Sequence, residues 1–484
     1  MIEAGTAVHL VFVAYILAML ALGWVAWRRT RDLSDYLLGG RRLGRWVTAL
    51  SAEASDMSGW LMLGLPGYAY AAGLEAGWIA LGLLVGTWLN WRLMAEPLRR
   101  VSEALDDALT LPDFLAHRFH RHATALRLIA AGFILVFFTF YTSSGLVAGG
   151  RLFETVFGWD YRIAVFTAAA AVAAYTLFGG FLAVSWTDVV QGLLMGAALL
   201  VVPVAALDAG GGLEASRAAM AAVDPALLDP WTDRNGQPLG FIALASLLAW
   251  GLGYFGQPHI LARFMAIRDP REIGPARRIA VGWVALTLCG ALCVGWAAIG
   301  YLQPPLDGAD TERVFMHLVG ALFHPLIAGI LLAAILAAIM STADSQLLVA
   351  AAAVSNDTYR LGLRPDAPAT ELVWVGRLAV LVIAAVAAWM ALTPGSRVLE
   401  LVGHAWAGFG ATFGPVLLLA LYWRSLTGSG ALAGMLVGGV TVIVWSRLEG
   451  GWFDLYELLP GFLFAATAAV LVSRLDAMRG PETA

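Results

Sequence analysis

Two carboxylates lie inside one membrane-length apolar segment of this chain. Glu53 and Asp56 are spaced i, i+3, and the residues that follow, Ser58, Gly59 and Trp60, interrupt the apolar pattern. Lipid does not solvate an ionised carboxylate, and each unpaired one raises the free energy of insertion by roughly 2.5–3.5 kcal/mol on the translocon scale. A segment that keeps these residues is typical of a protein that binds an ion or a polar solute inside the membrane.

The composition is that of an integral membrane protein. Of the 484 residues, 60% are hydrophobic and only 13% are charged, whereas a soluble domain carries about 25% charged residues. The net charge of −4 gives no indication of a nucleic-acid partner. Cys289 and Cys293 lie one helical turn apart, so we expect packing residues rather than a disulfide.

Apolar runs of about 20 residues, enough to cross a hydrocarbon core of about 30 Å, recur along the chain. They predict an all-α integral membrane protein with about 13 transmembrane helices in a single transport domain, and no strands of an outer-membrane barrel. The expected spans are 7–27, 47–72, 75–95, 125–149, 161–182, 189–208, 239–264, 277–301, 323–353, 373–393, 401–421, 427–446 and 457–474.

Arginine placement predicts the orientation of these helices. The first, third, seventh and ninth loops carry the clusters, namely Arg28, Arg29, Arg31, Arg41, Arg42 and Arg45, then Arg99, Arg100, Arg118 and Arg121, then Arg268, Arg271, Arg277 and Arg278, and finally Arg360 and Arg364. Basic loops remain on the cytoplasmic side. The N-terminus is therefore expected outside and the C-terminus inside.

Two spans contain helix breakers near their centres. The second is interrupted at 55–59, and the seventh at 250–259, where the sequence is WGLGYFGQPH. They lie five helices apart, so they run in opposite directions through the membrane. This pattern predicts an inverted five-plus-five repeat, with its halves at 47–208 and 239–421, one leading helix at 7–27 and two trailing helices within 427–474.

A helix break within the membrane frees backbone groups, which must line a cavity because lipid cannot bond to them. Exposed carbonyls suit a hard cation, and the carbonyls of Ala54 and Met57 are candidates. Half-helix amides suit a carboxylate, and the candidates are those of Ser58, Gly59 and Trp60. The alternative is a tilted helix with a glycine kink, which the carboxylate beside the glycine disfavours.

The ninth span carries a second polar group. Ser341 and Thr342 are adjacent hydroxyls, followed by Asp344 and Gln346 in an otherwise apolar run. Hydroxyls in such helices usually bond back to their own i−4 carbonyls. The nearby Asp344 favours a binding site instead, and an oxygen-only set suits a monovalent cation rather than a transition metal, which prefers His or Cys.

Aromatic residues near the breaks are candidate walls of a pocket for a small solute. They are Trp60, Trp250 and Tyr254, with Pro258 beside the second break, whereas Tyr141 of the fourth span is equally consistent with packing. Aromatic residues at membrane depth are otherwise typical of interfacial belts.

Two charged residues are candidates for gating or coupling. Asp188 begins the sixth span and is either a second cation ligand or gate, or an acidic residue that complements the helix dipole. Arg41 either closes the inner vestibule against a carboxylate or marks the cytoplasmic side. We find no nucleophile–base pair or metal-spaced histidines, so an enzyme is not expected.

Several strings resemble those of the sodium:solute symporter family. They are LGGRRLG at 38–44, ASDMSGW at 54–60, FGGFLAVSWTD at 178–188 and GLGYFGQPH at 251–259, with further similarity at 335–342 and 405–410. The resemblance covers nearly the whole chain. It implies a leucine-transporter-like fold and Na⁺-driven uptake of L-proline by alternating access across a bacterial inner membrane.

The resemblance also implies the ligands. Sodium would be bound by the carbonyls of Ala54, Met57 and Ala338 and the hydroxyls of Ser341 and Thr342, with Asp56 as the acidic residue on which sodium affinity depends. L-proline would lie among Ser58, Gly59, Trp60, Tyr141, Trp250, Tyr254 and Pro258, and Arg41 would assist on the cytoplasmic side.

Two positions depart from the family pattern. Glu53 stands where a glycine is expected and Asp344 where a serine is expected. Glu53 makes either a polar packing contact or an additional charge linked to transport, and we favour the packing contact because two ionised carboxylates this close repel each other. The remaining alternatives are a Na⁺- or H⁺-coupled symporter of another small solute, a sensor with a transporter fold, and an ion channel.

Overall fold

The protein is described by a computed structural model that covers residues 5–27, 33–178, 180–233, 235–393 and 395–479. Arg28, Arg29, Arg31 and Gly179, which entered the expectations above, lie outside the described residues. Within the described ranges the chain is helical, and its only β pairing consists of two isolated bridges. Ten helices of this part of the chain are long and apolar enough to cross a membrane.

The helices coincide with the expected spans. The unbroken ones are α1 (Thr6–Trp27), α5 (Gly77–Leu93), α8 (Ala123–Phe157), α9 (Tyr161–Phe178), α10 (Phe181–Ala209), α14 (Ile273–Ala298), α16 (Pro325–Ala352), α17 (Ala369–Ala391), α18 (Val398–Tyr422), α19 (Gly428–Trp445) and α20 (Leu458–Arg479). Short helices that the apolar runs did not predict lie in the connections: α2 (Leu33–Leu38), α6 (Ala95–Ala104), α7 (Leu111–Arg118), α11 (Leu213–Val223) and α15 (Val314–Leu322).

Both expected helix breaks are present. The first span consists of α3 (Arg45–Asp56), a break at Met57 and Ser58, a π-turn at Trp60–Gly64 and α4 (Leu65–Ala72). The other consists of α12 (Phe241–Ala249), a 3-10 segment at Trp250–Gly256 that we call η6, and α13 (Pro258–Ala266). Gln257 is extended between η6 and α13, and Pro258 starts the new helix because it needs no hydrogen-bond acceptor for its nitrogen.

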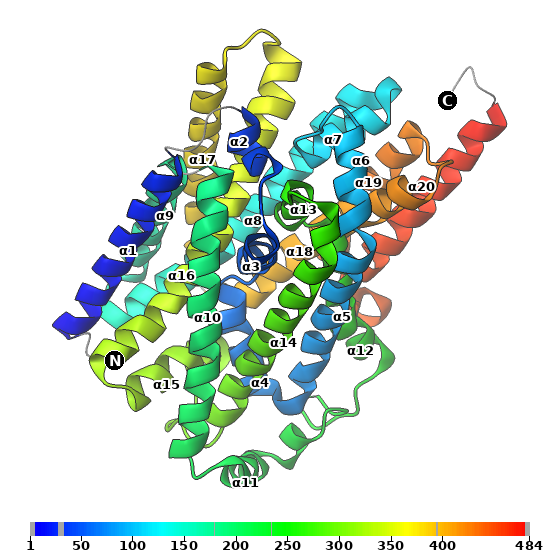
Figure 1. Ribbon diagram of the computed structural model, residues 1–484. Helices are drawn as coiled ribbons and strands as arrows, with labels where there is room; N and C mark the ends of the chain where they lie inside the picture. The colour runs from blue at the N-terminus through cyan, green and yellow to red at the C-terminus, as the bar shows by residue number, and fades with distance from the viewer. Residues whose placement is uncertain (1–4, 28–32, 179, 234, 394, 480–484) are drawn as a thin grey trace.

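Glycine allows α5 to lie directly on η6. A Cβ at Gly86 would lie 2.3 Å from the carbonyl oxygen of Gly251, and one at Gly251 would lie 2.2 Å from that of Gly82. Figure 1 shows α3, α16 and α18 in the middle of the molecule, with α1, α9 and α17 on one side and α19 and α20 on the other. The two breaks therefore lie in the interior, packed against the central helices.

Four basic loops meet on one face of the molecule, which we call the basic face. Backbone atoms near Ile267 bind Arg99, since Arg99 Nε donates to the Ile267 carbonyl at 2.7 Å. Thr110 on α7 donates to Asp357, beyond the end of α16. Figure 1 places α2 and α7 at this face, and α11 and the N-terminal end of α1 at the opposite one.

Candidate functional site

Backbone and hydroxyl oxygens from α3 and α16 converge beside the first helix break. The Ser341 hydroxyl donates to the carbonyl of Ala54 at 2.8 Å and lies 3.2 Å from that of Ala338, and the Thr342 hydroxyl lies 3.5 Å from the Ala54 carbonyl. All four residues are buried. This set of hard oxygens has the chemistry that a monovalent cation requires. Met57, the fifth expected ligand, is buried in the break directly after α3.

Asp56 hydrogen-bonds to the other broken helix rather than to this oxygen cluster. Its Oδ2 accepts from the Tyr254 hydroxyl at 2.8 Å. Its backbone carbonyl accepts from Trp60 Nε1 at 3.0 Å and from the Tyr141 hydroxyl at 3.1 Å. Three expected solute-binding aromatics thus surround one residue at the break, and all three are buried.

The other residues expected around the solute lie at different depths. Gly59 is packed so closely that an added Cβ would be 2.5 Å from Cβ of Ala148, and Ser58 accepts from the Trp60 amide at 3.4 Å. Trp250 borders a large cavity, whereas Pro258 borders a separate cavity of about 30 Å³ near the basic face. The structure therefore does not bring Trp250 and Pro258 to one cavity.

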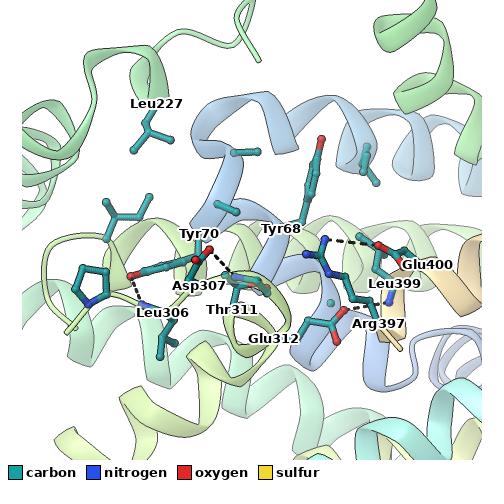
Figure 2. Close-up of a pocket in the computed structure, with 18 of the residues that line it drawn as sticks. Tyr68, Tyr70, Leu227, Leu306, Asp307, Thr311, Glu312, Arg397, Leu399 and Glu400 are labelled. Carbon is teal, nitrogen blue, oxygen red and sulfur yellow. Dashed lines mark hydrogen bonds and ion pairs between the residues drawn. The ribbon is translucent and has the colours of Figure 1, made fainter. Parts of the chain in front are cut away.

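A cavity of about 870 Å³, which we call the vestibule, opens on the face opposite the basic face. It extends to Trp250, whose ring stacks on Tyr456 with centroids 5.2 Å apart. Figure 2 shows its wall, where Arg397 lies beside Glu400 and Tyr70 contacts Leu306. Its charged lining residues are Asp224, Asp307, Glu312, Arg397, Glu400 and Glu457. Because carboxylates predominate, the vestibule attracts cations.

Arg41 closes the basic face. Its guanidinium donates to the Asp107 carboxylate at 2.6 Å, the Met265 carbonyl at 2.6 Å, the Ala108 carbonyl at 2.9 Å and the Ser102 hydroxyl at 3.1 Å. These bonds join the segment before α3 to α6 and to the end of α13. The pathway is thus open at the vestibule and closed by packed side chains at the basic face.

Asp188 lies in a buried ion pair, and the alternative that it complements a helix dipole is wrong. Helix α10 begins at Phe181, so Asp188 is two turns inside it. Its Oδ2 accepts from the Ser51 hydroxyl at 2.6 Å and lies 3.1 Å from Nη2 of Arg263. The same Arg263 atom donates to the Ser345 hydroxyl at 2.6 Å. This network ties together α3, α10, α13 and α16, and Asp344 borders it through Ser345.

Glu53 makes the polar contact that we favoured from the sequence. Its Oε1 accepts from the indole of Trp91 on α5 at 2.8 Å. The side chain is 1% exposed, and its second oxygen has no hydrogen-bond partner among the described residues.

Sequence reasoning did not identify two residues that organise this site. Arg263 is the cation of the buried network, and its position in α13, eleven residues after the glycine-rich break begins at Leu252, gave no periodic signal. Trp406 on α18 donates to the Trp250 carbonyl at 2.7 Å and packs edge-on against Tyr254. Its signal was the string 405–410, which resembled the family but carried no assigned role.

Comparisons with known proteins agree with this arrangement. The model of the sodium:solute symporter family matches residues 36–438. The sodium/proline symporter of Salmonella typhimurium is 50% identical over 476 residues, covering 97% of this chain and 93% of that protein. The osmoregulated proline transporter OpuE of Bacillus subtilis is 49% identical over 467 residues, covering 95% and 93%.

Solved structures share the fold at low sequence identity. A Na⁺-coupled sialic acid symporter in a substrate-bound outward-open state aligns with a TM-score of 0.79 at 19% identity, over 98% of both chains. A nucleobase-cation-symport-1 family transporter in a closed conformation aligns with a TM-score of 0.57 at 13% identity, over 93% of this chain and 97% of that one. The leucine-transporter-like fold expected from the sequence is confirmed.

The family match extends over most of the chain, and the similarity to the curated relatives is nearly end to end. Members of this family are multi-pass membrane transporters rather than enzymes, and sodium is their coupling ion. The chain belongs to the sodium:solute symporter family.

Proposed function

We propose that this protein couples the entry of Na⁺ to the uptake of L-proline by alternating access. The observation that carries the proposal is the junction at the first helix break, where Ala54 meets Ser341 and Asp56 meets Tyr254. One short segment thereby supplies groups to an oxygen cluster for a cation and to an aromatic enclosure for a solute. The substrate follows from the printed names of relatives at 49–50% identity.

In this proposal, sodium is held by the carbonyls of Ala54, Met57 and Ala338 and the hydroxyls of Ser341 and Thr342. Asp56 supports sodium binding from the neighbouring break. L-proline binds among Ser58, Gly59, Trp60, Tyr141, Trp250, Tyr254 and Pro258. The clustering of Trp60, Tyr141 and Tyr254 on Asp56 supports the central part of this pocket. Pro258 would reach the solute only after the basic face opens, because it borders a different cavity from Trp250.

The proposed orientation places the basic face in the cytoplasm, the N-terminus outside and the C-terminus inside. It is supported by the meeting of the arginine-rich loops on one face, since such loops remain cytoplasmic. The vestibule then opens to the outside, and the contacts of Arg41 and Arg263 close the inner half of the pathway. The proposed repeat halves are 47–208 and 239–421, each of which starts with a broken helix.

The test is uptake of labelled L-proline into proteoliposomes under imposed Na⁺ or H⁺ gradients. An inward Na⁺ gradient should drive accumulation, and an H⁺ gradient alone should not. The Asp56→Ala variant should insert normally but lose Na⁺-dependent uptake. Competition by unlabelled solutes measures selectivity, and a stronger competitor from another chemical class would assign the pocket to that solute instead.

A further inference from the structure

A second group of carboxylate oxygens lies next to the first break, and the proposed sodium site does not use it. Glu53 and Asp56 are spaced i, i+3, so their side chains project from neighbouring positions on α3. Each carboxylate uses one oxygen in a hydrogen bond, to Trp91 and Tyr254 respectively, both at 2.8 Å. Oε2 of Glu53 and Oδ1 of Asp56 have no hydrogen-bond partner in the described part of the chain.

No cationic side chain among the described residues forms an ion pair with Glu53 or Asp56. Arg263, the cation buried on α13, is instead paired with Asp188. Glu53 is 1% exposed and Asp56 is 0% exposed, so water does not compensate their charge. A buried carboxylate without a partner is costly, and two in proximity are more so, which makes the pair strongly attractive to a cation.

Asn90 on α5 provides an independent observation. Its side chain is fully buried, and neither its amide oxygen nor its amide nitrogen has a partner among the described residues. It follows Thr87, a neighbour of the Tyr254 phenol, by three residues, and it precedes Trp91, which binds Glu53. This stretch of α5 therefore faces both carboxylates, and Asn90 can add a third hard oxygen.

We infer that Oε2 of Glu53, Oδ1 of Asp56 and the amide oxygen of Asn90 hold a second sodium ion. The ion would join α3, α5 and the η6 side of the second break, whereas the first site joins α3 and α16. Few oxygens in a dry site suit a monovalent cation, because Ca²⁺ takes about 6–8 oxygen ligands. The inference rests on the proposed Na⁺-coupled transport and sets its stoichiometry at about two sodium ions per solute.

Glu53→Gln is the decisive variant. Glutamine keeps the volume and an oxygen that can accept from Trp91, but it removes the charge. Equilibrium binding of labelled sodium to the purified protein should fall from about two ions to about one, and the Na⁺:proline flux ratio should fall likewise. Asn90→Leu should also lose one ion, although both carboxylates remain. The matched control is Glu449→Gln in an exposed loop, which should keep both ions.

Each outcome decides the matter. One sodium ion in the wild type, or two in Glu53→Gln or in Asn90→Leu, would overturn the assignment. A variant that loses stimulation by an H⁺ gradient while its sodium count stays the same would assign Glu53 to a proton and also overturn it. Sodium binding is measured without solute, so failure of this site is distinguishable from absence of proline uptake in the wild type, which refutes the proposed function.

Discussion

The hydroxyl of Tyr254 donates a hydrogen bond of 2.8 Å to Oδ2 of Asp56, and it thereby connects the two broken helices at their breaks. Two residues before Asp56, the carbonyl of Ala54 accepts from Ser341 on α16. The same turn of α3 therefore touches both the oxygen cluster and the aromatic enclosure. Coupling between ion and solute needs no long path, and each ligand should tighten the other by the same factor.

Tyr254→Phe should weaken sodium-dependent proline binding by roughly 10–100-fold, because a hydrogen bond to a charged group is worth about 1.5–3 kcal/mol. Phenylalanine keeps the edge-on contact with Trp406. The measurement is proline Kd with and without Na⁺. Tyr456→Phe is the control: its hydroxyl bonds only to the neutral Gly403 carbonyl, so its effect should be smaller. Wild-type coupling in Tyr254→Phe would contradict the role given to this bond.

Ser341→Ala should weaken apparent sodium affinity by about tenfold or more, since loss of a buried polar partner costs about 1–3 kcal/mol. Thr342→Ala should act in the same direction. The control is Ser355→Ala beyond the end of α16, because the Ser355 hydroxyl bonds back to the Ala351 carbonyl of its own segment. The Na⁺ concentration for half-maximal uptake reports all three, and unchanged values for both Ser341 and Thr342 variants would move the sodium site elsewhere.

Arg41→Ala should open the basic face. The substitution removes four hydrogen bonds that hold the segment before α3 against α6 and α13. A cysteine placed at Ala262, with Cys289 and Cys293 replaced by alanine, should then react with a polar thiol reagent roughly tenfold faster from that side. Arg45→Ala, at an exposed position on the same face, should leave the rate unchanged. Equal labelling in both variants would remove Arg41 from the closure.

Gly86→Ala should destabilise the protein and abolish transport. The new Cβ would lie 2.3 Å from the Gly251 carbonyl oxygen, so α5 must move away from η6, and such overpacking costs about 1–3 kcal/mol or more. Gly77→Ala on the same helix meets no atom within 4 Å and should be neutral. Thermal unfolding in detergent measures both, and equal melting temperatures would show that the close packing tolerates a side chain.

Much of the fold was predictable because lipid imposes simple requirements on a chain. Each span needs about 20 apolar residues, and the runs at 7–27 and 401–421 became α1 and α18 with shifts of only a few residues. The breaks at 55–59 and 250–259 were also predictable, since glycine, proline and polar residues at membrane depth have no role in a straight helix. The hydroxyls of Ser341 and Thr342 stood out for the same reason.

The sequence by itself thus determined the number and course of the spans, the places where two of them unwind, and the oxygen-rich chemistry beside one break. Only the tertiary structure decided which partners meet: Asp188 with Arg263, Glu53 with Trp91, and Trp250 in a different cavity from Pro258. The physical reason is that hydrophobicity specifies that a helix lies in lipid, but not its rotation or its neighbours. Those depend on close packing between segments far apart in the chain, such as Gly86 on Gly251.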